Sequence, residues 1–217
     1  NITDFQMNPS SLQAGGHPNV MFRIDPDATL ADQVGDDLKK VVYEFPAGAL
    51  GNPEAAVGAK CTATQYSSDK CPSGSFIGSM STKLRLKIGS SYTTLNAPGS
   101  MYVMAPAKNT DPIEIGFIIR PTGYRFIFMK SSVAGVVAVR SGIDADYGLT
   151  MVFDNIPRTL TTTWGSTVQA TLMDFVANLN SRTKTDKSGP VFTYMPTRCD
   201  VATARATITS YNGVALN

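Results

Sequence analysis

The sequence predicts an all-β protein, an antiparallel β-sandwich of two packed sheets with one or two short helical turns. Apolar and alternating segments recur about every ten residues with turn residues between them, which is typical of antiparallel sheets packed face to face. Charged residues make up only 17% of the chain, below the roughly 25% of an ordinary domain. Ser, Thr, Gly, Pro and Asn are plentiful between the apolar segments, which suits many strands joined by turns.

The length of the chain favours a single domain. Its 217 residues, 42% of them hydrophobic, can bury a substantial core, and all-β domains of about 200 to 250 residues often form one unit. We therefore expect residues 1–217 to form one module. A division into two smaller sandwiches near Pro98 is the alternative.

Residues 83–88, with the sequence Lys-Leu-Arg-Leu-Lys-Ile, have the most regular strand pattern, with cations on one face and aliphatic residues on the other. The other expected strands cover residues 2–7, 19–24, 38–45, 92–95, 99–104, 113–119, 124–130, 133–140, 147–154, 159–163, 167–173 and 205–211. Glycine, proline, asparagine and aspartate separate them, chiefly at residues 13–18, 96–99, 109–112 and 121–123.

Three segments are candidates for the one or two expected helical turns. Thr62 and Gln65 have the spacing at which a hydroxyl and an amide cap each other's backbone amides at a helix start. Residues 29–34 lie in an acidic, polar segment, and residues 174–180 favour a brief helix. The polar residues 180–189 are expected to form a loop.

Cys61, Cys71 and Cys199 allow three different single disulfides. Buried free thiols are one interpretation, and a Cys61–Cys71 bridge that closes a short loop in an oxidising compartment is the one we favour. Cys199 is then a free thiol or one that joins two chains. Zinc is not expected, because the chain has one histidine and lacks a Cys-x-x-Cys pair.

Charge and hydropathy restrict the partners. The formal net charge is +2 and the Lys and Arg residues are scattered, so we expect no nucleic-acid partner. The longest apolar run, near Val133 to Val139, is far shorter than the roughly 20 residues that span a bilayer. No basic and apolar leader precedes Asn1, which fits a processed mature protein or a trimmed chain. These features favour a secreted or cell-surface protein without a membrane span.

The sequence offers little catalytic chemistry, so we expect no enzyme, no catalytic residues and no cofactor or metal. His17, the only histidine, would have to serve any Ser-His-Asp or Cys-His arrangement. Its position between glycines and a proline favours a turn residue fixed by a backbone hydrogen bond. No serine lies in a Gly-x-Ser-x-Gly pattern, and glutamate occurs only as Glu44, Glu54 and Glu114.

Six short motifs recur in one order: Gln13 to Pro18, Phe45 to Pro53, Cys61 to Pro72, Asp146 to Thr150, Asn155 to Pro157 and Pro196 to Cys199. Together they resemble a family of poorly characterised secreted bacterial β-proteins, often multi-modular, with QAGGHP, LPxGLxGNP, CxxxxFxxxxCP, DYGLT, NIP and NPTxC boxes. The match covers nearly the whole chain. Phe45 replaces the usual Leu and Tyr66 the usual Phe. The resemblance implies export to the cell surface or beyond, and the family has no established activity or catalytic residues to carry over.

Two functions are therefore expected. The first is a non-catalytic extracellular structural module in a surface fibre, coat or adhesive assembly, which associates with itself or with a cell-surface partner by β-strand addition. Its donor strand would lie in the first ten residues, where Ile2, Phe5 and Met7 alternate imperfectly with polar residues. The second is a carbohydrate- or ligand-binding sandwich, with a glycan as partner. Its ligand-facing aromatic residues would be Trp164, Tyr92, Tyr124 and Tyr211.

Overall fold

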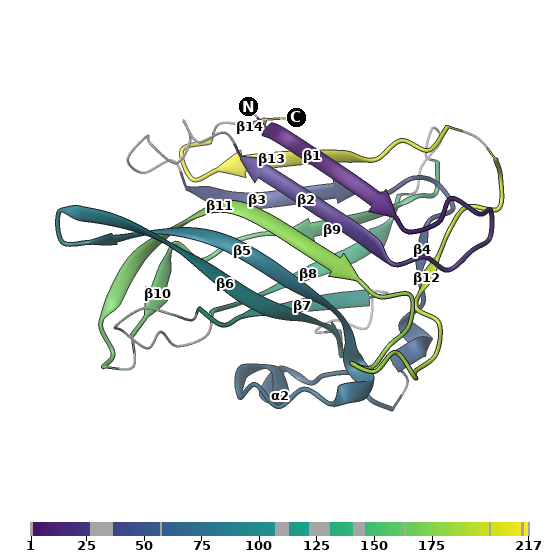
Figure 1. Ribbon diagram of the computed structural model, residues 1–217, viewed down its shortest axis with the longest axis horizontal. Coiled ribbons are helices and arrows are strands. Elements are labelled where there is room, and N and C mark those ends of the chain that lie inside the picture. The colour runs from purple at the N-terminus through teal and green to yellow at the C-terminus, as the bar shows by residue number, and fades with distance from the viewer. Residues whose placement is uncertain are drawn as a thin grey trace.

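Antiparallel β-strands form almost the whole protein, seen here in a computed structural model (Figure 1). The structure describes residues 2–26, 37–56, 58–106, 113–121, 131–140, 146–162, 164–199, 201–213 and 215–216. The strands are β1 Ile2–Pro9, β2 Val20–Pro26, β3 Leu38–Glu44, β4 Leu50–Gly51, β5 Phe76–Ile88, β6 Ser91–Met104, β7 Ile113–Ile119, β8 Ser131–Val139, β9 Leu149–Phe153, β10 Thr159–Thr161, β11 Thr167–Leu179, β12 Thr193–Tyr194, β13 Arg205–Ser210 and β14 Ala215–Leu216. The helical pieces are α2 Ala63–Ser67 and the 3₁₀ turns η1 Pro53–Ala56 and η2 Ser73–Ser75.

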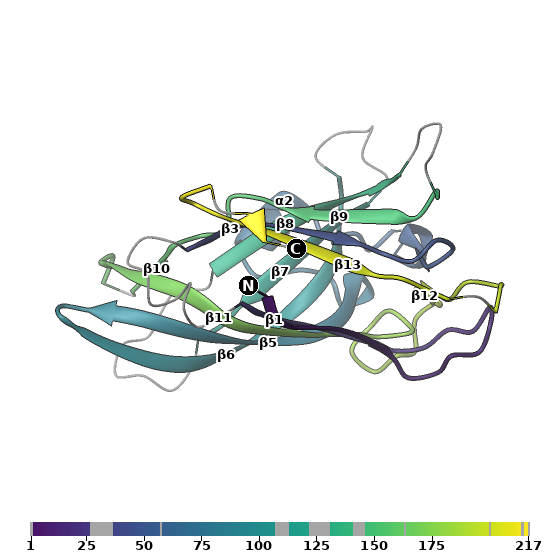
Figure 2. The ribbon, with the colours of Figure 1, turned by 90° about the horizontal axis from the view of Figure 1, so that it is seen from above.

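Twelve of these strands belong to one sheet, with the order β1-β2-β11-β5-β6-β7-β8-β9-β3-β13-β14 and β10 paired to β11. The sheet turns over at β7, so that β1, β2, β11, β5 and β6 form one layer and β8, β9, β3 and β13 form the layer that faces it (Figures 1 and 2). The all-β antiparallel class is confirmed. The two layers of the expected sandwich are two halves of one nearly closed sheet, and β12 and β4 form a separate pair.

The core lies between the two layers and is rich in aromatic rings. Phe117 of β7 stacks on Phe153 of β9 with 4.5 Å between ring centroids. The same ring lies 5.6 Å from that of Phe175 on β11. Phe117 therefore joins the layers at the turnover strand.

The cysteine loop has the predicted structure. A disulfide joins Cys61 and Cys71. Thr62 begins α2 with a capping box, in which its side chain accepts a hydrogen bond from the Gln65 backbone and the Gln65 side chain accepts one from the Thr62 backbone. The Tyr66 hydroxyl donates to the backbone carbonyl of Phe117 at 2.7 Å, which attaches the loop to β7.

The predicted break at residues 96–99 is wrong, because β6 continues through Pro98 as a strand. Pro98 lies opposite Ser81 of β5, just beyond Gly99, where the pairing of β6 with β7 ends. Its carbonyl accepts from the Arg120 backbone on the β7 side. Within a strand, the N–H and C=O of one residue point to the same side. The N–H that Pro98 lacks would therefore point towards β7 at a position beyond the last residue pair of β6 and β7, where no ladder hydrogen bond is lost.

The helix expected at residues 174–180 is also wrong, since β11 extends to Leu179. A register shift between Leu172 and Asp174 in the pairing with β5 inserts one extra residue. Such a bulge reverses the inward and outward phase, so the alternation is not continuous in the sequence. The helical turn expected at residues 29–34 and the strand expected at residues 124–130 lie outside the described residues.

Candidate assembly surface

β1, the candidate donor strand, lies at one edge of the large sheet and pairs with β2 alone. Phe5 and Met7 are partly buried and pack against the core cluster from this edge. The ring of Phe5 lies 6.1 Å from that of Tyr43 on β3, so β1 reaches the opposite layer. Ile2 is paired with Pro26 through the backbone, and its side chain is outside the described set.

The outer face of β1 is polar, and a side chain on it contacts Arg23 of the neighbouring strand β2. Arg23 of β2 contacts Asp4 at 3.2 Å, Asp25 at 3.5 Å and Asp174 at 3.3 Å. The Gln6 amide donates to the Asp4 carboxylate at 2.8 Å. These side chains are partly exposed, and exposed ion pairs contribute little to stability. A strand with the same sequence from another molecule could make the same contacts.

An exposed segment connects β1 to an anchored loop. Residues 10–13 are exposed, and Leu12 is 84% exposed. From Gly15 the chain is fixed, because the Gly15 N–H donates to the Pro196 carbonyl and the Met195 N–H donates to the Gly16 carbonyl. Gly15 has a φ of +66°, a conformation that glycine adopts without strain. The geometry therefore separates a strand paired on one side from a loop that is hydrogen-bonded to residues 195 and 196.

β13 and β14 form the other edge of the sheet. β14 pairs only with Ile208 and Thr209, whereas β3 pairs with β13 along its whole length. Residues 205–207 thus have a strand partner on one side only, within the described part of the chain. β1 lies in one layer and β13 in the other (Figure 2). In the described residues no backbone hydrogen bond joins these two edges.

His17 is fixed as the sequence predicted. Its Nδ1 lies 2.9 Å from the Thr193 carbonyl, and its ring packs edge-on against Tyr194 at 4.5 Å. The Thr193 hydroxyl donates to the Pro18 carbonyl at 2.6 Å. The first motif of the sequence therefore docks on the segment before the last one, which gives both a structural role.

The Asp146 motif is held by Arg140, which follows β8. The Arg140 guanidinium donates to both carboxylate oxygens of Asp146 at 2.8 Å and to the carbonyls of Leu149 and Phe45 at 2.6 Å. Hydrogen bonds from Arg140 and from the Gly148 backbone lower the pKa of Asp146 to about 2. A side chain at Gly148 would collide with the Arg140 guanidinium, so this motif too has a structural role.

Asp37 is a buried carboxylate that the sequence analysis did not single out. It accepts hydrogen bonds from Arg158 at 2.9 Å, Gln169 at 3.4 Å and Thr171 at 2.6 Å. It lies between Asp36 and Leu38, and nothing in this local sequence marks it as buried. The contacts join the start of β3 to β11 and close this end of the sandwich.

The candidate ligand-facing aromatic residues have different environments. Trp164 and Tyr92 are 68% and 48% exposed. Trp164 lies in the β10–β11 turn and Tyr92 at the tip of the β5–β6 hairpin, at the same end of the molecule (Figure 1). Tyr211 is half-buried beneath the Arg158 guanidinium, whose Cζ lies 4.8 Å from the centroid of the Tyr211 ring. Tyr124 is outside the described residues.

Cys199 is a free, exposed thiol. It follows Pro196, in the segment that anchors the loop after β1. Within the described residues, no group of three or more His, Cys, Asp or Glu side chains could hold a metal ion.

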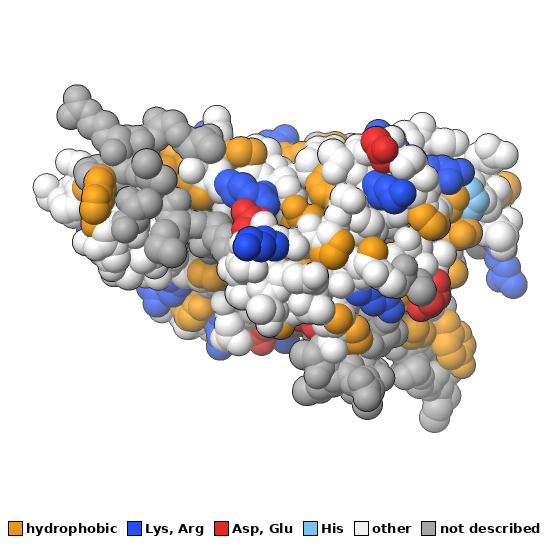
Figure 3. Space-filling model, turned by 90° about the horizontal axis from the view of Figure 1, so that it is seen from below, with side chains coloured by type: hydrophobic (Ala, Val, Ile, Leu, Met, Phe, Trp, Pro, Cys, Tyr) orange, Lys and Arg blue, Asp and Glu red, His pale blue; other side chains and the backbone are white. Residues whose placement is uncertain are grey.

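The described surface has mixed character. On the face seen from below, Lys and Arg side chains are scattered with Asp and Glu among them, and hydrophobic side chains are dispersed (Figure 3). None of the helices in the described ranges is long and apolar enough to cross a membrane.

Neither a protein-family model, nor a curated protein, nor a solved structure matches the chain.

Proposed function

We propose that this protein is a non-catalytic, extracellular structural module whose copies are joined by exchange of β1. The observation that carries the proposal is the attachment of β1, which pairs with β2 alone and is followed by the exposed residues 10–13. An unpaired strand edge is a template for another chain. Strand addition uses main-chain hydrogen bonds for affinity and side-chain pockets for specificity.

In this assembly each copy places its β1 beside the β2 of a neighbour. Phe5 and Met7 fill the same positions against the neighbour's core, and Asp4 meets the neighbour's Arg23. The anchored loop from Gly15 onwards stays on its own molecule, and residues 10–13 bridge the two. Exchange that does not close into a ring makes an open chain of subunits, as a fibre or coat requires.

The disulfide supports an extracellular role. The Cys61–Cys71 disulfide fits an oxidising compartment. Export to the cell surface, where such a module would serve a fibre, coat or adhesive assembly, agrees with the motifs in the sequence. The exposed Cys199 adds a covalent means of joining chains.

A cysteine pair tests strand exchange directly. Asn8 of β1 and Met21 of β2 are opposite each other in the register, and facing residues in antiparallel strands are within reach of a disulfide. In the triple variant Asn8→Cys, Met21→Cys, Cys199→Ser, exchange forms disulfides between chains. A ladder of oligomers is then expected on a non-reducing denaturing gel after oxidation of the assembled protein.

Asn178→Cys with Met21→Cys, also in the Cys199→Ser background, is the matched control. Asn178 of β11 faces Met21 from the other side of β2 and does not take part in exchange. This pair is expected to form only disulfides within one chain. Disulfides within one chain for both pairs, in protein that has assembled, would contradict exchange of β1.

A glycan-binding module is the second candidate function. It is supported by the exposure of Trp164 and Tyr92 at one end of the molecule. Exposed aromatic side chains offer stacking area for sugar rings at little conformational cost. The Arg85 guanidinium lies 4.2 Å from the centroid of the Tyr92 ring and covers one of its faces. Trp164 would therefore be the main contact.

A further inference from the structure

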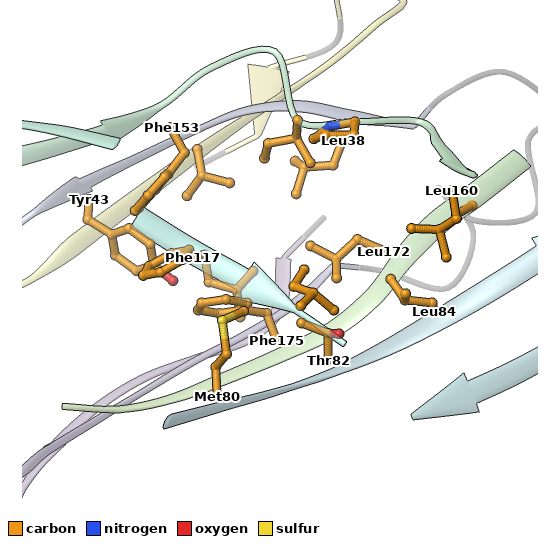
Figure 4. Close-up of a pocket in the computed structure, with 16 residues that line it drawn as sticks. Leu38, Tyr43, Met80, Thr82, Leu84, Phe117, Phe153, Leu160, Leu172 and Phe175 are labelled. Carbon is orange, nitrogen blue, oxygen red and sulfur yellow. The ribbon is translucent and has the colours of Figure 1, made fainter. Parts of the chain in front are cut away.

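A cavity lies between the two layers and has a volume of about 80 Å³ (Figure 4). We call it the inter-layer cavity. Leu84, Leu160 and Leu172 line one end of it, while Phe117 and Tyr43 line the other. The described residues that line it include no charged side chain.

Tyr43 brings an unsatisfied polar group to this apolar space. Its side chain is 4% exposed, and its ring points inward between the layers (Figure 4). Among the described residues, its hydroxyl has no hydrogen-bond partner. The other hydroxyl that lines the cavity, that of Thr82, donates to the Ala97 carbonyl at 3.0 Å. Burial of a hydroxyl without a partner costs about 1–3 kcal/mol, so Tyr43 offers a donor that a ligand can satisfy.

Two smaller cavities continue the space along the sandwich. The second, of about 40 Å³, shares Tyr43, Phe117 and Phe175 with the inter-layer cavity. The third, of about 60 Å³, shares Phe22 and Met151 with the second. Each cavity shares lining residues with the next, and none of the described residues that line the three is charged. The space therefore suits a long, thin molecule better than a compact one.

Water is a poor occupant of this space. A buried water needs two to four polar partners, whereas apolar cavities stay dry and take up apolar molecules. Among the described residues that line the inter-layer cavity, Tyr43 has the one buried side-chain polar atom without a hydrogen-bond partner. An ionised ligand is disfavoured too, because a charge in such a space has no counter-charge.

We infer that the inter-layer cavity binds an uncharged linear alkyl molecule with one oxygen acceptor, such as an aliphatic ketone. The Tyr43 hydroxyl donates a hydrogen bond to that oxygen. The alkyl chain lies against Leu84, Leu160 and Leu172 or extends past Phe117 towards the second cavity.

Titration with heptan-2-one, followed by NMR of labelled methyl groups, tests the inference. Specific, saturable shifts are expected for the methyl groups of Leu84, Leu160 and Leu172. Heptanoate at pH 7 has a chain of similar length with a charge, and it is expected to produce none. Absence of saturable shifts with the ketone, or equal binding of heptanoate, would overturn the inference.

Two variants localise the ligand. Tyr43→Phe keeps the shape of the cavity without the hydroxyl, and its affinity for heptan-2-one should fall about tenfold, the equivalent of one hydrogen bond. Ala170→Leu, which fills the lining of the cavity, should abolish binding. If Tyr43→Phe binds the ketone as tightly as the wild type, the proposed hydrogen bond is wrong. Infrared spectroscopy of the ketone bound to the wild type is independent of variant folding, and a carbonyl stretch without a hydrogen-bond shift would overturn the inference.

Discussion

The buried hydroxyl of Tyr43 makes the free energy of unfolding depend on pH in the alkaline range. Burial raises the pKa of its hydroxyl far above the ordinary value of 10.0. An unfolded chain ionises this tyrosine near pH 10, while the folded chain keeps it neutral. The folded state then binds more protons than the unfolded state, and stability is lost as the pH rises above the unfolded pKa.

We expect the free energy of unfolding of the wild type to fall by about 1.4 kcal/mol for each pH unit above roughly 10, through this residue alone. Tyr43→Phe removes that contribution. At pH 7 the variant should be as stable as the wild type or more stable by up to about 1 kcal/mol, because an unsatisfied buried hydroxyl is lost. Urea unfolding at pH 7 and pH 11 measures both effects.

Tyr92→Phe is the matched control, since it removes a hydroxyl from an exposed ring. It should retain the alkaline loss of stability that the wild type shows. Equal pH dependence in the wild type and in Tyr43→Phe would show that Tyr43 is not buried in the folded protein.

The elements combine local and long-range constraints. In the cysteine loop the constraints are local. The disulfide joins Cys61 and Cys71, which are 10 residues apart, and the capping box of Thr62 and Gln65 lies between them. β11, by contrast, lies between β2 and β5. Its C-terminal half, Phe175 to Leu179, pairs with both of these strands, which are far away in the sequence. Elements of the first kind are predictable from short patterns, whereas those of the second kind are not.

Loss of the disulfide should destabilise the protein. In the double variant Cys61→Ser, Cys71→Ser, the free energy of unfolding is expected to fall by about 3 kcal/mol, the chain-entropy value for a loop of this length. Denaturant unfolding in non-reducing buffer measures the change. Cys199→Ser, which removes the exposed free thiol, should have little effect. A double variant as stable as the wild type would contradict a stabilising role for the bridge.

At the scale of the whole molecule, one sheet of twelve strands folds over until its two edges approach each other. Its edges are β1 and the β13–β14 pair. A sheet that closes completely has no free edges. This one stops short of closure within its described part, which supports the proposed exchange of β1.

The native mass in solution tests assembly in the whole protein. Light scattering after gel filtration should give a species larger than the 23.2 kDa chain. The large species should persist in Cys199→Ser if strand exchange joins the copies, and it should be lost in that variant if the thiol does. A strict monomer that binds a glycan through Trp164 would contradict the structural role and favour the second candidate.

Part of the candidate site could be predicted from the sequence. The first strand and the anchored turn at His17 follow from local patterns of apolar, turn and polar residues, whereas the exposure of Trp164 was only one of two possibilities. The open side of β1 could not be predicted from the sequence, because it depends on which strand lies next to β1. The inter-layer cavity is also a property of packing, since its lining comes from strands throughout the chain.

The sequence by itself determined the all-β class, most strands and the capped turn of α2, and it favoured the Cys61–Cys71 disulfide over the alternatives, since each of these depends on neighbours along the chain. Only the tertiary structure decided that both layers belong to one sheet, that Pro98 lies inside a strand and that a bulge carries β11 to Leu179. It also decided that Asp37 and Tyr43 are buried. The reason is that strand order, register and burial are set by contacts between residues far apart in the sequence, which no local pattern encodes.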